Sequence, residues 1–318
     1  MFADSRWILE NARFLRQLAA LLNAGVPIQQ ALSMAGRDCS KELQKALQIA
    51  SQYVTTGQGL AESLKLASRR FDRWTLSLIY AAEESGALPE TCDRLANNFE
   101  IQIRRRRLYR SVAFFCLLLM LGSCVFIFAL MQRSLHFLWL PRFWIWLVVV
   151  SIAFWGLLRW TNAQYQGQAL LRSLSRLPMI TPIVEARSMI YLSELAIALQ
   201  SGLSLLQGLD LLQRRIPDPV LVNQLELATQ QVKQGHTLSQ GLAGKVPLVA
   251  FQMVRVGEET GDLGRSLQKM GEYYEAQLYY RLRQLYATLR PITLIALGAI
   301  VLLAGVQTIS NLLNRLPS

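Results

Sequence analysis

The chain has 318 residues, of which 52% are hydrophobic, and its formal net charge is +12. A mean hydropathy of +0.26 lies above that of an ordinary soluble domain, which predicts that part of the chain lies in lipid. The four cysteines form no CxxC pair, and the two histidines, His136 and His236, lie far apart, so the composition argues against a disulfide framework, a metal site or histidine catalysis.

The first hundred residues predict a helical bundle. Apolar residues between 5 and 23 recur at helical spacing, and Gly25 followed by Pro27 is typical of one helix ending and another beginning at 27–36. Further helices are expected at 41–55, 60–68, 72–85 and from 88 onward. Alternating runs typical of strands are missing from the sequence, so we expect about six helices and no sheet.

Three segments have the length and apolar character of membrane spans. Residues 112–130 read VAFFCLLLMLGSCVFIFAL, carry no charge, and form about 28 Å of helix. Residues 138–158 form a second candidate after a short hairpin, and residues 291–313 form a third. We therefore expect an all-α membrane protein with three transmembrane helices in contact with the lipid bilayer.

Basic residues gather on one side of these spans. Arg104–Arg107 precede the first span, Arg159 follows the second, and Arg290 precedes the third. By the positive-inside rule the N-terminus is cytoplasmic and the C-terminus periplasmic. A nucleic-acid patch at Arg104–Arg107 is the weaker reading, because the membrane position already accounts for these charges; we expect no nucleic-acid partner.

The chain also contains an internal duplication. The stretch VGEETGDL at 256–263 repeats AAEESGAL at 81–88, and YLSELAIALQSGL at 191–203 repeats FLRQLAALLNAGV at 14–26. The spacing between matching glycines is nearly constant. The predicted order is a cytoplasmic bundle at 1–110, a transmembrane hairpin at 111–158, a homologous cytoplasmic bundle at 159–290 and a transmembrane helix at 291–313.

On these two repeats, FLRQLAALLNAGVPIQQAL and YLSELAIALQSGLSLLQGL, each followed by the acidic stretch and a long helix, the chain resembles protein F of type II secretion systems and its type IV pilus counterpart. The resemblance implies an inner-membrane platform that couples a cytoplasmic secretion or pilus ATPase to polymerisation of pilin-like subunits. It also implies a homo-oligomer that contacts other inner-membrane assembly subunits. Ala82 stands where that family usually has glycine.

The repeated acidic turns are the candidate partner-binding site. Carboxylates in the last turn of a helix face the negative end of its dipole, so some group should compensate them. An arginine such as Arg94 or Arg265, a metal, or solvent alone could do so, whereas the resemblance implies a contact surface for a partner subunit. The candidate residues are Glu83, Glu84, Gly86, Glu258, Glu259, Gly261 and Asp262.

The sequence predicts no cofactor and no enzyme. Gly244-Lys245 is followed by Val246, which does not complete a phosphate-binding loop, and no nucleophile or base accompanies the acidic pairs. Any ATP would be hydrolysed by a separate ATPase. A polytopic transporter or channel with duplicated cytoplasmic domains is the main alternative, and a membrane-anchored ligand sensor is a weaker one. Against a transporter, the first and third spans carry no ionisable residue of the kind that lines a substrate path.

Overall fold

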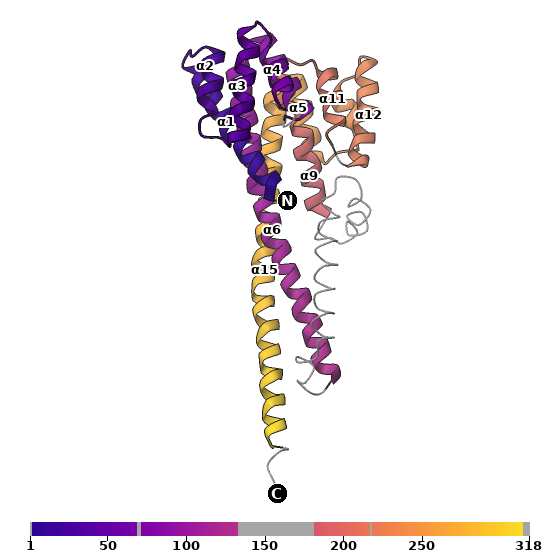
Figure 1. Ribbon diagram of the computed structural model, residues 1–318. Coiled ribbons are helices and arrows are strands. Elements are labelled where there is room, and N and C mark those ends of the chain that lie inside the picture. The colour runs from indigo at the N-terminus through magenta and orange to yellow at the C-terminus, as the bar shows by residue number, and fades with distance from the viewer. Residues whose placement is uncertain (1, 69–70, 133–180, 217, 314–318) are drawn as a thin grey trace. The chain divides into compact units, whose positions relative to one another are not determined.

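The computed structural model describes residues 2–68, 71–132, 181–216 and 218–313, in which the regular elements are all helices (Figure 1). The all-α fold class is therefore confirmed for this part of the chain. The chain divides into two compact units. One comprises Met1–Arg105 and Val184–Leu278, and the other comprises Arg106–Ile183 and Tyr279–Ser318.

The first repeat begins with six helices whose ends lie close to those predicted. Gly86 ends the fifth helix, and Asp72 begins it by accepting a hydrogen bond from the backbone N–H of Thr75 at 3.4 Å. These helices are α1 (Phe2–Asn23), α2 (Ile28–Ala35), α3 (Lys41–Thr55), α4 (Leu60–Ala67), α5 (Arg73–Ser85) and α6 (Leu88–Gln132).

The second repeat has the same order of helices with one difference. The counterpart of α1 is broken at Glu194, where backbone bonds from Glu194 to Tyr191 and from Ile197 to Glu194 tighten the turn. The helices are α9 (Thr181–Ser193), α10 (Leu195–Gln200), α11 (Leu205–Gln213), α12 (Pro219–Lys233), α13 (Leu238–Leu242), α14 (Leu248–Glu259) and α15 (Leu263–Leu313).

The two repeats also share their packing order. In the first repeat α2 packs on α1 and α3, and α4 packs on α3 and α5; in the second, α11 packs on α10 and α12, and α13 packs on α12 and α14. The same positions are buried in both. Leu15 and Leu18 on α1 are fully buried, and so are their counterparts Leu192 and Leu195. The helical periodicity thus identified the core side of α1, apart from Leu9, which is partly exposed.

The predicted spans fall on helices or outside the described residues. Residues 112–130 belong to α6, residues 291–313 belong to α15, and 138–158 lie outside the described residues. In the part of the chain that the structure describes, no helix is both long and apolar enough to cross a membrane. Cys39 and Cys92 are free thiols, and burial raises the pKa of Cys92 to about 12.

Candidate functional site

Each acidic turn ends a helix at a glycine in the left-handed conformation. Gly86 follows α5 with φ 73°, and Gly261 follows α14 with φ 73°. A residue with a Cβ is strained at this angle, whereas glycine adopts it freely, so the glycine stops one helix and redirects the chain into the next. Both acidic turns thus have a glycine cap with the same left-handed conformation.

The first glutamate of the turn in repeat 1 binds the beginning of another helix. Glu83 accepts a hydrogen bond from the backbone N–H of Leu60 at 2.8 Å and one from that of Ala61 at 3.4 Å. These two amides belong to the first turn of α4, where backbone N–H groups have no partner within their own helix. Glu83 therefore fastens the end of α5 to the start of α4.

Repeat 2 has the same arrangement. Glu258 accepts hydrogen bonds from the backbone N–H groups of Leu238 and Ser239, the latter at 3.0 Å, at the start of α13. The positive end of that helix dipole faces the carboxylate. The group that compensates the unfavourable position of each first glutamate is thus the N-terminus of a neighbouring helix.

Arg94 and Arg265, the arginines named as candidate partners of these glutamates, pair with other carboxylates, although a different nearby arginine, Arg255, pairs with Glu259. Arg94 lies 3.5 Å from Glu90, four residues before it on α6. Arg265 lies 3.4 Å from Asp262, three residues before it, and Asp262 also accepts the backbone N–H of Arg265. Each arginine has a closer carboxylate on its own helix, and Asp262 serves as the cap of α15.

The second glutamate of each turn faces solvent instead. The Tyr80 hydroxyl donates to Glu84 at 2.6 Å, and this hydrogen bond raises the pKa of the Tyr80 phenol. At the matching positions Arg255 donates to Glu259 at 2.7 Å, with the two side chains 56% and 60% exposed. These contacts join neighbours on one helix, so both carboxylates remain at the surface.

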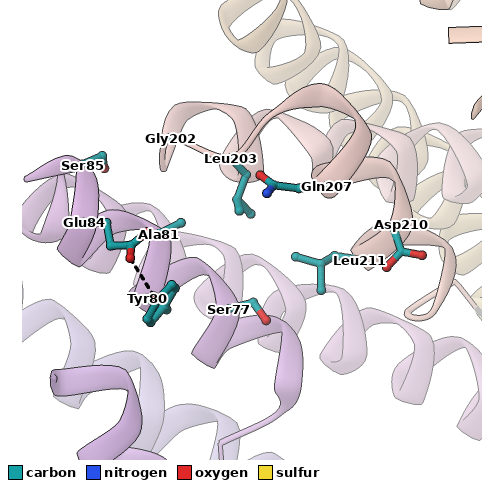
Figure 2. A pocket seen from close by; sticks show the side chains of 10 residues that line it. All are labelled: Ser77, Tyr80, Ala81, Glu84, Ser85, Gly202, Leu203, Gln207, Asp210 and Leu211. Atoms are coloured by element: carbon teal, nitrogen blue, oxygen red, sulfur yellow. Dashed lines mark hydrogen bonds between the residues drawn. The ribbon is translucent and has the colours of Figure 1, made fainter. Parts of the chain in front are cut away.

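Glu84 borders a groove of about 530 Å³ between the two repeats (Figure 2). One wall is α5, with Tyr80 and Glu84, and the facing wall is α11, with Gln207, Asp210 and Leu211. Figure 2 shows the Tyr80–Glu84 hydrogen bond at its edge. Two carboxylates and adjoining apolar surface line this groove, which suits a segment carrying a basic and an apolar side chain.

Close backbone packing joins the repeats at one end of the groove. The Ser85 hydroxyl donates to the carbonyl oxygen of Ser201 at 3.1 Å, and the Thr91 hydroxyl donates to the hydroxyl oxygen of Ser201 at 3.2 Å. A Cβ added at Gly202 would lie 2.8 Å from Cβ of Ser85, closer than such atoms approach. Only glycine lets the α10–α11 turn of repeat 2 come this near to α5.

A half-buried arginine makes the second link between the repeats. Arg215 lies 2.8 Å from Asp72, the cap of α5, and 2.7 Å from Glu194, at the break between α9 and α10. Its guanidinium also lies 5.3 Å from the centre of the Trp74 ring. Burial by itself lowers the pKa of Arg215, but the carboxylates of Glu194 and Asp72 outweigh it and raise that pKa overall.

The role of Arg215 is not predicted from the sequence, because no local pattern marks it as the partner of Asp72 or Glu194. Asp72 is 143 positions away, so the pair exists only once the repeats are packed. A metal bound by the acidic turns is one of the alternatives that the sequence allows. Among the described residues, no cluster of three or more His, Cys, Asp or Glu is arranged to hold one.

Comparison with known proteins gives the same duplication. The family model for protein F of the type II secretion system matches the chain twice, at residues 14–132 and 191–309. The type IV pilus assembly protein PilC of Thermus thermophilus is 28% identical to this chain over 321 residues, which cover 91% of this chain and 78% of that protein.

Two further relatives come from both kinds of machine. PilC of Pseudomonas aeruginosa is 26% identical over 326 residues, covering 92% of this chain and 86% of the relative. The type II secretion system protein F of Xanthomonas campestris pv. campestris is 28% identical over 311 residues, covering 88% of this chain and 76% of the relative.

Proposed function

Because the chain belongs to the family of protein F of type II secretion systems, we propose that it is the inner-membrane platform protein of a secretion or type IV pilus assembly machine. Its relatives include a type II secretion protein and type IV pilus assembly proteins. In this role the chain is a scaffold, not an enzyme. It couples a separate cytoplasmic ATPase to the polymerisation of pilin-like subunits.

The proposal includes three membrane spans and two cytoplasmic bundles. Support comes from α15, where described apolar side chains such as Ile292, Val301 and Ile309 are exposed. Leu294 and Ile295, for example, are 63% and 72% exposed. Exposed apolar surface of this extent is costly in water and favourable against lipid. The bundles at 1–110 and 159–290 then lie in the cytoplasm, where a motor ATPase and other assembly subunits can reach them.

The assignment of the partner contact rests on the different contacts that the two glutamates of each acidic turn make. Glu83 and Glu258 are occupied by backbone amides, whereas Glu84 and Glu259 are solvent-exposed at matching positions. The bonds of Glu84 and Glu259 are to Tyr80 and Arg255 on their own helices, and both carboxylates lie at the surface, where a basic group of a partner can reach them. We therefore assign the partner contact to the second glutamate of each pair, and Asp210 extends this surface along the groove.

The test is reversal of these two charges. Glu84→Lys combined with Glu259→Lys should abolish secretion or piliation and co-purification with the ATPase, while the amount of full-length protein in the membrane stays unchanged. The matched control is Glu226→Lys, at an exposed position on α12 away from the turns. Normal secretion by the double variant would refute the assignment.

The membrane topology has an independent test. Reporter fusions at positions 134 and 318 should read periplasmic, whereas fusions at Ser68 and Gln224 should read cytoplasmic. A cytoplasmic reading at 318 would contradict the three-span arrangement and leave the family assignment intact.

A further inference from the structure

The structure leaves an apolar face of α14 exposed. Leu248 is 72% exposed, Val249 is 41% exposed and Val256 is 51% exposed. Val249 and Val256 lie seven residues apart, and therefore on one side of the helix. Together with Leu248 at the start of the helix, they form what we call the α14 face.

The matching face of α5 is covered by the rest of the same chain. Aligning RWTLSLIYAAEES with LVAFQMVRVGEET places Trp74 opposite Val249 and Ala81 opposite Val256. Trp74 is 5% exposed and Ala81 is 7% exposed. Repeat 2 covers this side, since Arg215 stacks over Trp74 and the Gly202 turn lies against Ala81 and Ser85.

The surface that covers α5 has an open counterpart in repeat 1. The turn at Gly202 corresponds to the turn at Gly25, and both glycines have positive φ, 94° and 78°. A Cβ at Gly202 would meet Ser85 at 2.8 Å, whereas a Cβ at Gly25 would meet nothing within 4 Å. Ala24 beside it is exposed, and Met34 on α2 is 42% exposed. We call Ala24, Gly25, Val26 and Met34 the α1–α2 surface.

We infer that copies of this chain associate head to tail, with the α14 face of one copy packed on the α1–α2 surface of the next. The contact repeats, between copies, the contact that already joins the two repeats within one copy. Each chain then has one free surface of each kind. Because the two surfaces differ, the association is heterologous and closes into a ring or continues as a filament.

The contact between copies should be weaker than the one within a chain. Asp38 stands where repeat 2 has Arg215, and Pro247 stands where repeat 1 has Asp72. The ion pairs of Arg215 that join the repeats are therefore not reproduced between copies. Apolar contact remains, which gives a reversible association suited to proteins concentrated in one membrane.

Photocrosslinking tests this contact in the full-length protein. Two differently tagged copies are expressed together, one of them carrying a photoreactive phenylalanine derivative in place of Val249. After irradiation, an adduct should join the two tags, and peptide mapping should place it between residues 24 and 38 of the other copy. The readout does not involve secretion, so it succeeds or fails separately from the proposed function.

Substitutions on each of the two surfaces, with a third one elsewhere as the control, test whether the adduct depends on this contact. Val256→Glu on the α14 face and Met34→Glu on the α1–α2 surface should each reduce the adduct about tenfold or more, which corresponds to a modest loss of binding free energy. Leu227→Glu should leave it unchanged, because Leu227 is 50% exposed on α12, away from both surfaces. The two variants lie in different repeats, so misfolding of one does not remove the test.

Each result decides the matter. An adduct in residues 24–38 that both variants weaken supports head-to-tail association. An adduct between two α14 helices means a symmetric dimer and overturns the inference. An adduct only with a different protein, or none between copies, overturns it as well.

Discussion

Helices α5 and α14 are built alike and have different neighbours. Both end at a left-handed glycine, and both use a glutamate to hold the first turn of the helix before them. Trp74 on α5 is nevertheless 5% exposed, whereas Val249 at the matching position on α14 is 41% exposed. The contacts inside a repeat are therefore duplicated, whereas the contacts between repeats are not. The reason is that α5 of repeat 1 packs on the α10–α11 turn of repeat 2, and within the described part of one chain α14 has no such turn to pack on.

Among these predictions, removing Arg215 should cause the largest loss of stability, because Arg215 joins the two repeats. Arg215→Met leaves Glu194, whose side chain is 5% exposed, with no cation beside it. Leaving a buried charge unpaired costs about 3–5 kcal/mol. We expect the free energy of unfolding of the full-length protein, measured with denaturant in detergent, to fall by an amount in that range.

The control is the preceding residue. Arg214→Ala removes an exposed ion pair with Asp210, at 3.0 Å, worth about 0–1 kcal/mol. Equal losses for Arg214→Ala and Arg215→Met would mean that the link between the repeats does not depend on Arg215.

The two corresponding turn glycines give the next largest difference. Gly25→Ala and Gly202→Ala both place a Cβ at positive φ, a strain of about 1–2 kcal/mol. At Gly202 the new atom also overlaps Ser85, which adds about 1–3 kcal/mol. Thermal unfolding should therefore show a distinctly lower midpoint for Gly202→Ala. Similar midpoints would contradict the close approach of the repeats at this turn.

The glutamates should behave alike in the two repeats. Glu83→Gln and Glu258→Gln each lose charged acceptors for the N–H groups at the start of α4 or α13, and we expect each to reduce stability by about 1–3 kcal/mol. Glu84→Gln and Glu259→Gln should change it by less than about 1 kcal/mol, because both carboxylates are exposed. Amide exchange at Leu60 and Leu238 measures this locally. Faster exchange in the Glu84 variant than in the Glu83 variant would reverse the assignment.

Features that depend on residues close together in the sequence, such as helix bounds and turns, could be predicted from the sequence. The helix expected at 41–55 is α3, Lys41–Thr55, because periodic apolar residues and the turns that flank it are all local signals. The acidic turns were found in the same way, since a carboxylate pair before a glycine is visible twice. Their left-handed caps have the same local origin, because glycine adopts a positive φ more readily than any other residue.

What the sequence could not supply is the contact made across distance. The hydrogen bond from Leu60 to Glu83 spans 23 positions, and the pair of Arg215 with Asp72 spans 143. Nothing in the local pattern distinguishes Glu83 from Glu84, although one is held by a helix and the other faces solvent. The separation of the candidate site into an anchoring and an exposed carboxylate therefore required the packed structure.

The departure at Ala82 has a physical explanation of the same kind. At Gly257, its counterpart, a Cβ would lie 2.6 Å from Cβ of Ser266, whose hydroxyl bonds to the backbone of Met253 in its own repeat. In repeat 1 the residue that corresponds to Ser266 is Thr91, whose hydroxyl bonds to Ser201 of the other repeat. An alanine at position 82 is therefore found in the repeat where Thr91 bonds to the other repeat.

Glu83 and Glu84 are consecutive residues, and this has a mechanical consequence. A partner that pulls on Glu84 pulls on a helix turn whose next carboxylate is bonded to two backbone amides of α4. The load passes through those bonds into the bundle, so the glycine turn after α5 does not have to bear it. Glu258 and Glu259 repeat the arrangement, so a partner bound at both turns would pull on two points that are each bonded to a neighbouring helix.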